Sequence, residues 1–114
     1  MENPIWFEFY SILNASKNKT YRERVTRQCT SLMNFFVKNS LLKVNPFDEN
    51  GIIREDLEIY KNELTEMGQY LFTSGAVYKW LAYTDGGKKI ENYKQLEKAL
   101  TEYKKNNQEE GIVD

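Results

Sequence analysis

Five acidic residues in the middle of the chain are the side chains that could most readily do acid–base or metal chemistry. They are Asp48, Glu49, Glu55, Asp56 and Glu58. Paired carboxylates can act as general acid and base, and carboxylate oxygens suit Ca²⁺ or Mg²⁺. An EF-hand loop would need aspartates at alternate positions before its turn glycine, and Gly51 lacks them. We therefore expect no metal site and no catalysis here, but an exposed acidic surface.

Other residue types that enzymes depend on are scarce. The chain has no histidine, which removes the usual general base, the Ser–His and Cys–His pairs and the commonest metal ligand. The single cysteine, Cys29, shares a helical stripe with Val25 and Leu32, so it is predicted to be buried and unreactive. Gly86-Gly87-Lys88 lacks the other residues of a phosphate-binding P-loop and is better explained as a helix end. We expect a protein that is not an enzyme and uses no cofactor.

The charges are segregated along the sequence although the formal net charge is only −1. Residues 17–43 carry seven cations against Glu23 alone, a local net charge of +6. Residues 48–66 carry seven carboxylates against Arg54 and Lys61, a local net charge of −5. Such asymmetry is typical of a surface that meets a charged partner. The alternative is that the two segments pack together and neutralise each other, or are simply solvated.

The basic residues crowd the start of an expected helix, where cations oppose the helix dipole at a cost of about 0.3–1 kcal/mol each at low salt. Folding alone does not require this arrangement. One hypothesis is a patch that contacts the phosphates of RNA or DNA, made of Arg22, Arg24 and Arg27. The chain as a whole is not basic and contains no recognised nucleic-acid motif. A nucleic-acid or regulatory binding module is therefore kept as the alternative function.

Apolar residues recur at helical spacing in four segments, which begin at Pro4, Thr20, Thr65 and Asn92. The first three end near Leu13, Leu42 and the pair Gly86-Gly87. Residues 43–51 are a predicted loop, and residues 52–60 fit a loop with a helical turn or, alternatively, a short extended segment. The fold class expected is all-α: a single small bundle of four to five helices over residues 1–106, with a polar, frayed tail at 107–114.

The third expected helix carries more aromatic residues than one face can bury. Phe72, Trp80 and Tyr83 lie away from its main apolar stripe, so either the helix is central and buried all round, or Trp80 and Tyr83 anchor a partner. Gly68 and Gly75 each cost a helix about 1 kcal/mol relative to alanine. Because they are seven residues apart, they lie on roughly the same face of the expected helix. This indicates that another backbone approaches this face closely, either from a neighbouring helix or from a bound protein.

The C-terminal half of the chain resembles a known family. Its similarity is to immunity proteins of bacterial contact-dependent growth inhibition systems, and the segments that carry it are Leu57-Glu-Ile-Tyr60, Glu63-Leu-Thr-Glu-Met-Gly68, Lys79-Trp-Leu81, Asp85-Gly-Gly87 and Leu96-Glu-Lys-Ala-Leu100. The resemblance covers about residues 57–100. Residues 1–55 show no resemblance of this kind.

That resemblance implies a binding function. Such proteins bind a cognate toxin domain and block its active site, and the toxins are frequently nucleases, commonly directed at tRNA, with basic substrate clefts. An acidic surface could occlude such a cleft by imitating phosphate charge. The expected toxin contacts are therefore the five acidic residues named above, with Trp80 and Tyr83 as weaker aromatic candidates. The chain has no secretory signal and no membrane-spanning run, so a cytoplasmic location is expected, with neither membrane nor nucleic acid as a partner.

Overall fold

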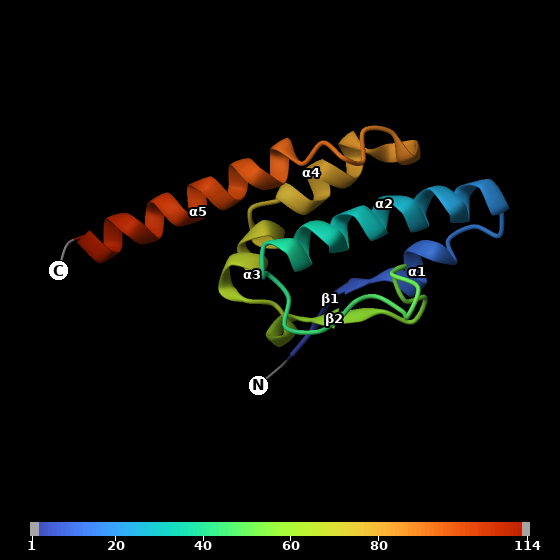
Figure 1. Ribbon diagram of the computed structural model, residues 1–114, viewed down its shortest axis with the longest axis horizontal. Coiled ribbons are helices and arrows are strands. Elements are labelled where there is room, and N and C mark those ends of the chain that lie inside the picture. Colours follow the sequence, from blue (N-terminus) through green and yellow to red (C-terminus); the bar gives the residue numbers. More distant parts are fainter. Residues whose placement is uncertain (1–2, 113–114) are drawn as a thin grey trace.

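In the computed structural model, which describes residues 3–112 and side chains as far as residue 107, the chain is mostly helical with one small sheet (Figure 1). The described residues form β1 (Ile5–Glu8), α1 (Phe9–Leu13), α2 (Lys19–Lys38), β2 (Glu58–Tyr60), α3 (Glu66–Thr73), α4 (Ala76–Tyr83) and α5 (Lys94–Ile112). Two short 3₁₀ turns, η1 (Lys61–Glu63) and η2 (Asp85–Gly87), follow β2 and α4. The expected helical fold is therefore confirmed in its coarse form, whereas a purely all-α fold is wrong.

The sheet is a two-stranded antiparallel ribbon that joins the N-terminus to the middle of the chain. Its register pairs Phe7 with Ile59 and Glu8 with Glu58, with an irregularity between Ile5 and Phe7. Phe7 and Ile59 are buried, while Glu8 and Glu58 lie on the outer side. The helix predicted from Pro4 is thus wrong over residues 5–8, because pairing with a distant strand satisfies these backbone groups and buries Phe7. The extended alternative for residues 58–60 is confirmed.

Helix α2, with 20 residues, is the longest element of the described chain, and its two ends differ from those predicted. Asn18, rather than Thr20, caps it, since its side-chain oxygen accepts a hydrogen bond from the Tyr21 amide at 3.0 Å. The helix ends at Lys38, earlier than expected, because Ser40 takes a left-handed backbone with φ +56°. The Leu41 amide then donates to the Phe36 carbonyl at 2.9 Å, and the Leu41 side chain turns into the core.

The single long helix expected after Thr65 is two helices in the structure. Thr65 caps α3 as predicted, its hydroxyl accepting from the Gly68 amide at 3.1 Å. Gly75 has φ +84°, a left-handed conformation that ends α3 and starts α4 in a new direction. The close approach predicted at Gly68 is confirmed, because a Cβ built there would lie 2.4 Å from the Leu41 carbonyl oxygen. The same prediction is wrong at Gly75, where a Cβ would meet nothing within 4 Å.

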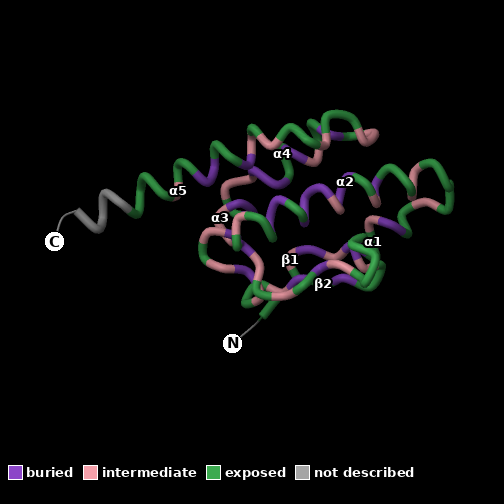
Figure 2. Tube along the Cα trace, viewed as in Figure 1, coloured by how far each residue is buried: buried purple, intermediate pink, exposed green. Residues whose placement is uncertain are grey.

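The core lies on both sides of α2. In Figure 1 the ribbon and α1 lie on one side of this helix and α4 lies on the other, while the first half of α5 packs against α3 and α4. Figure 2 shows the buried residues along α2, along α4 and in the first half of α5. Within the described chain no helix has an apolar run that could cross a bilayer.

The second half of α5 extends away from the rest of the molecule (Figure 1). Its backbone is helical to Ile112, which includes most of the segment expected to fray, and residues 113–114 lie outside the described residues. The expected boundary at residue 106 therefore stays a prediction.

Candidate functional site

The five acidic residues predicted to contact a partner are all exposed, but they do not form one surface. Asp48 is occupied in its own loop, where its carboxylate accepts hydrogen bonds from the Asn50 and Ile52 amides at 2.8 and 3.0 Å. Glu49 sits beside it at the loop tip. Asp48 therefore shapes a turn. Of the other members of the set, Asp56 and Glu58 lie in one place and Glu55 lies in another.

Asp56 and Glu58 belong to a group at one end of the ribbon, which we call the acidic ribbon end: Glu8, Tyr10, Asp56 and Glu58. These side chains surround a small hollow of about 210 Å³, and Tyr10 is 59 % exposed. Glu8 and Glu58 stand directly opposite each other across the two strands. Like charges in that position destabilise a sheet, so folding does not explain the pair.

The charges of the acidic ribbon end are little compensated. Arg54 lies 3.9 Å from Asp56, and the two side chains are 39 % and 84 % exposed, so this ion pair contributes little in water. The Ser11 hydroxyl donates to Glu8. No local pattern places Glu8 and Tyr10 at this site, because the apolar spacing predicts a helix over residues 5–8. Only the pairing of β1 with β2 brings them beside Glu58.

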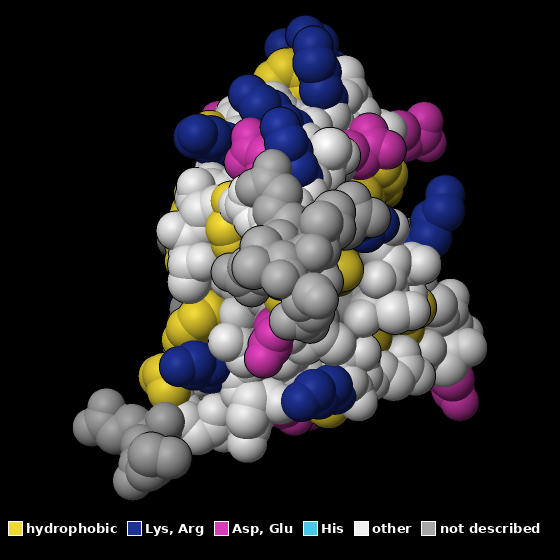
Figure 3. Space-filling model, turned by 90° about the vertical axis from the view of Figure 1, so that its left-hand side faces the viewer, with side chains coloured by type: hydrophobic (Ala, Val, Ile, Leu, Met, Phe, Trp, Pro, Cys, Tyr) yellow, Lys and Arg dark blue, Asp and Glu magenta, His cyan; other side chains and the backbone are white. Residues whose placement is uncertain are grey.

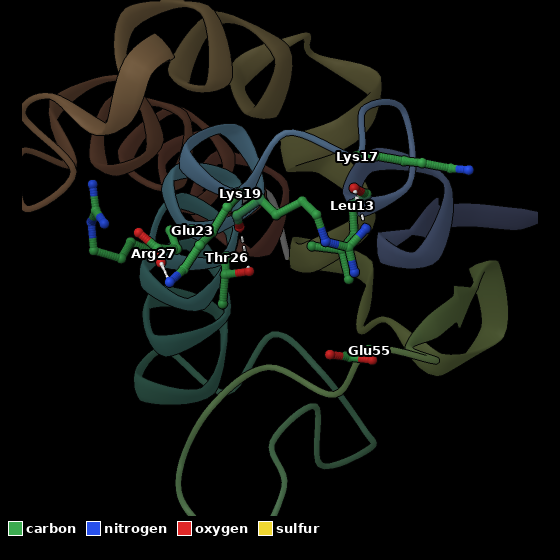
Figure 4. Close-up of a pocket in the computed structure, with 8 residues that line it drawn as sticks. Leu13, Lys17, Lys19, Glu23, Thr26, Arg27 and Glu55 are labelled. Atoms are coloured by element: carbon green, nitrogen blue, oxygen red, sulfur yellow. Dashed lines mark hydrogen bonds and ion pairs between the residues drawn. The ribbon is translucent and has the colours of Figure 1, made fainter.

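Glu55 faces a different and largely basic cavity of about 590 Å³ on the outer side of α2. In Figure 4, Glu55 approaches this cavity from one wall, with Lys19, Glu23 and Thr26 across from it on α2. Lys17, Lys19, Arg22 and Arg27 contribute four cations to the lining, against Glu23 and Glu55. The acidic segment of residues 48–66 and the basic segment of residues 17–43 therefore meet here, but Glu55 is the acidic-segment residue that lines this cavity.

A second cavity, of about 360 Å³, continues along the same helix and shares Thr26 and Arg27 with the first. We call the two together the α2 groove. Its first half is basic, and its second half runs past Thr30 and Asn34 of α2 between Ile52 and Ile90. The Ser31 hydroxyl, deeper in this half, donates to the Ile90 carbonyl and bonds to Tyr93.

The proposed basic patch of Arg22, Arg24 and Arg27 is divided in the structure. Arg22 and Arg27 line the α2 groove, whereas Arg24 does not. Arg24 lies against the η2 turn, where its Cβ would be 3.7 Å from a Cβ on Gly87, and the Nη2 atom of Arg27 would be 3.2 Å from the same position. Residues two apart on a helix point to different sides, and this separates Arg24 from Arg22. Lys17 and Lys19, which the patch did not include, are the cations that accompany Arg22 and Arg27.

The two aromatic candidates have different surroundings. Trp80 is fully buried, its indole N–H donates to the Asn92 carbonyl at 2.9 Å, and its ring stacks on Tyr93. The idea that Trp80 anchors a partner is therefore wrong, and the alternative of a buried helix holds for this residue. Tyr83 is 36 % exposed, with Lys89 over its ring and its hydroxyl bonded to Asn92.

A further aromatic surface, not expected from the sequence, lies where β1 meets α3 and α4. A hollow of about 290 Å³ is lined by Ile5, Trp6, Phe72, Thr73 and Tyr78. The rings of Phe72 and Tyr78 are 6.3 Å apart, and Tyr78 is largely exposed. On the face in Figure 3, hydrophobic side chains show at the lower left, and Lys and Arg gather at the top with carboxylates beside them. Exposed aromatic groups of this kind favour protein contact.

Cys29 is expected to be unreactive while the chain is folded. Burial raises the pKa of its thiol from 9.0 to about 12, so almost no nucleophilic thiolate forms near neutral pH. Iodoacetamide at pH 8 should therefore modify Cys29 only as fast as the fold opens, and rapidly in urea. Fast labelling of the folded chain would contradict this assignment.

The same burial makes stability depend on alkaline pH. The unfolded thiol ionises near pH 9, whereas the folded thiol keeps its proton to about pH 12, so the free energy of unfolding should fall across this range. Urea titrations of the chain and of Cys29→Ala, measured at several pH values from 8 to 11, would isolate the contribution. This contribution of the thiol to the fall in the free energy of unfolding should be absent from Cys29→Ala.

In the part of the chain with described side chains, no three His, Cys, Asp or Glu residues are grouped so that they could hold a metal ion. No protein-family model matches the sequence, and no curated protein or solved structure matches the chain. The acidic ribbon end, the α2 groove and the aromatic hollow beside Tyr78 are the surface features from which a function can be argued.

Proposed function

We propose that this chain is a cytoplasmic immunity protein that binds a cognate toxin domain and blocks its active site. The observation that carries the proposal is the acidic ribbon end, where Glu8 opposes Glu58 beside Asp56 and the exposed Tyr10. The resemblance of residues 57–100 to immunity proteins of contact-dependent growth inhibition systems supports the same class of partner. The proposed protein has no catalytic activity of its own.

A basic nuclease cleft is the partner surface that best fits this arrangement. Carboxylates held in a fixed cluster can replace substrate phosphates, and complementary charge speeds the encounter of the two proteins. Binding also relieves the repulsion between Glu8 and Glu58, which the free protein must bear. Tyr10 supplies a large, rigid contact at the same place, and tyrosine is a frequent hot-spot residue in interfaces. Of the five acidic residues first expected to bind, the proposal keeps Asp56 and Glu58. It adds Glu8 as a third charged contact.

The proposal is tested with the toxin domain encoded in the reading frame directly upstream, which we expect to belong to a large exported protein. Co-expression of the chain should restore growth of cells that make this domain. The variant Asp56→Lys/Glu58→Lys should slow association of the purified pair by about tenfold or more at low salt, measured by stopped-flow fluorescence or surface plasmon resonance.

A matched control carries the same change in net charge elsewhere. Glu49→Lys/Glu91→Lys reverses two exposed carboxylates outside the acidic ribbon end and should leave the association rate within about twofold. Equal rates for the two double variants would show that the acidic ribbon end is not the contact. Failure of the wild-type chain to bind or to restore growth would refute the immunity function itself.

A further inference from the structure

We infer that the acidic ribbon end and the aromatic hollow beside Tyr78 belong to one interface, in which the hollow takes an uncharged apolar side chain that the toxin presents next to its basic cleft. The aromatic hollow has a volume of about 290 Å³ and is lined by Ile5, Trp6, Phe72, Thr73 and Tyr78. The partner is the toxin domain of the proposed function, on which this inference therefore rests. The carboxylates set the rate at which the two proteins associate, and the hollow sets the rate at which they separate.

The register of the ribbon places Ile5 on the same face as the acidic ribbon end. Along β2, Glu58 is exposed, Ile59 is buried and Tyr60 is half-buried, so the first and the third lie on the outer face. Ile5 stands opposite Tyr60 on the neighbouring strand. Glu8 stands opposite Glu58. Residues directly opposite each other in a sheet share a face, so Ile5 and Glu8 both lie on the outer face.

The irregularity in the ribbon makes this arrangement possible. Ile5 and Glu8 are three residues apart, and in a regular strand an odd separation puts two side chains on opposite faces. Between Ile5 and Phe7, however, β1 advances two residues while β2 advances one, which is the arrangement of a β-bulge. Ile5 and Glu8 therefore lie on one face, about 7 Å apart along the ribbon, the rise of two residues of β2. A standard interface covers about 800 Å² of each partner, roughly 30 Å across, and includes both contacts.

The aromatic hollow keeps apolar surface in water that folding does not bury. Phe72, which is 6 % exposed, forms its base, whereas Tyr78 is 60 % and Ile5 is 40 % exposed. The Phe72 ring lies 6.0 Å from the Trp6 ring and 6.3 Å from the Tyr78 ring, with interplanar angles of 58° and 77°. The three rings are thus inclined to one another around the hollow. A concave apolar site of this kind favours an anchoring side chain from a partner.

Exposed apolar side chains are concentrated at these two contacts. Six large hydrophobic side chains of the described chain are at least 36 % exposed, and three of them, Ile5, Tyr10 and Tyr78, line the aromatic hollow or the acidic ribbon end. Exposed apolar surface rimmed by polar groups is typical of protein-interaction sites. The grouping is expected if one protein partner covers both contacts at once.

The group that enters the hollow is uncharged. None of the described residues that line the hollow carries a charge, so no carboxylate among them could pair with a cation. The Lys61 ammonium already lies 5.7 Å from the centre of the Trp6 ring, and it would repel an arginine or lysine side chain brought to that ring. A leucine, methionine or phenylalanine side chain meets no such repulsion and is stabilised by leaving water. Cations of the toxin are attracted instead to Glu8, Asp56 and Glu58.

The two contacts are expected to act on different rate constants. Attraction between charges acts at long range, raises the rate of association and weakens as salt is added. Apolar packing acts only when the surfaces touch, so its loss raises the rate of dissociation. The roles of the two contacts can therefore be measured separately.

The experiment measures both rate constants for the chain and the upstream-encoded toxin domain by surface plasmon resonance, at low salt and at about 0.5 M salt. Tyr78→Ala should raise the dissociation rate about tenfold or more at both salt concentrations and change the association rate by less than about twofold. Tyr78→Phe keeps the ring and should dissociate within about twofold of the wild-type rate. Tyr83→Ala makes the same truncation on the same helix outside the hollow, and it should also stay within about twofold.

A second measurement needs no substitution at Tyr78 and so does not depend on the stability of that variant. A chain labelled with 5-fluorotryptophan has two fluorine resonances, from Trp6 and Trp80. Trp6 lines the hollow, whereas Trp80 is fully buried elsewhere in the core. Addition of the unlabelled toxin domain should change the chemical shift of Trp6 and leave that of Trp80 in place. Trp6→Phe identifies the two resonances.

The wild-type complex distinguishes failure of this inference from failure of the immunity function. The shared interface is overturned if the wild-type chain binds the toxin and restores growth, but Tyr78→Ala dissociates no faster than Tyr83→Ala. It is also overturned if the Trp6 resonance does not move in that complex. Failure of the wild-type chain to bind the toxin would refute the immunity function and the shared interface together.

Discussion

Replacing Trp80 with alanine should lower the free energy of unfolding by about 3–5 kcal/mol, which is much or all of the stability of a domain of this size. Trp80 has no exposed surface, and its ring stacks on Tyr93 at 6.0 Å. Its loss leaves a large cavity between α4 and α5. It also leaves the Asn92 carbonyl without the hydrogen bond that the indole donates at 2.9 Å.

Urea denaturation followed by circular dichroism would measure the effect of Trp80→Ala. Tyr83→Ala, on the same helix, is the matched control, because Tyr83 is 36 % exposed and its loss should cost about 1 kcal/mol or less. Comparable losses in the two variants would contradict the role of Trp80 as the centre of this part of the core.

Gly68→Ala is expected to have the next largest effect, about 3 kcal/mol. The added Cβ would lie 2.4 Å from the carbonyl oxygen of Leu41, and this neighbour is backbone, which cannot rotate away as a side chain could. The same Leu41 carbonyl accepts a hydrogen bond from the Thr65 amide at 3.0 Å, so a shift would disturb the start of α3 as well.

Gly75→Ala separates this steric effect from the backbone freedom of glycine. A Cβ at Gly75 would meet nothing within 4 Å, but its φ of +84° is strained for alanine. We expect a cost of about 1–2 kcal/mol from that strain. Thermal and urea denaturation of both variants would rank them, and a larger loss for Gly75→Ala would show that the contact with Leu41 is readily relieved.

Local signals in the sequence predicted much of the helical framework. The sequence pattern predicts Thr65 as a helix cap and Gly68 as a point of close approach, and both are found. It predicts the last helix from Asn92, whose side chain accepts from the amide of Lys94, the first residue of α5. These features depend on residues that are neighbours in the chain or on the absence of a side chain. A sequence pattern can carry such information without a knowledge of the fold.

The ribbon could not be predicted in the same way. Ile5, Phe9 and Ile12 fit a helical stripe after Asn3-Pro4, yet residues 5–8 pair with residues 58–60. That pairing depends on a partner strand far along the chain. The break at Gly75 was missed for another reason: a glycine within an apolar pattern also fits a continuous helix packed against a neighbour.

The candidate site also combines features that local sequence predicts with features that depend on distant parts of the chain. Charge clustering in the sequence indicated an acidic surface, and Asp56 and Glu58 lie on one. Asp48 instead holds its own turn, and Glu55 faces the basic α2 groove. Glu8 and Tyr10 could not be included, since only the register of the ribbon places them beside Glu58.

The ribbon also sets the order in which the new chain can fold during its synthesis. Helix α2 depends on local contacts and can form as it leaves the ribosome, whereas β1 has no partner until residues 58–60 have emerged. The first strand made therefore stays unpaired until residue 60 of the 114 has been synthesised. Until then its apolar residues, Phe7 among them, remain exposed to other chains.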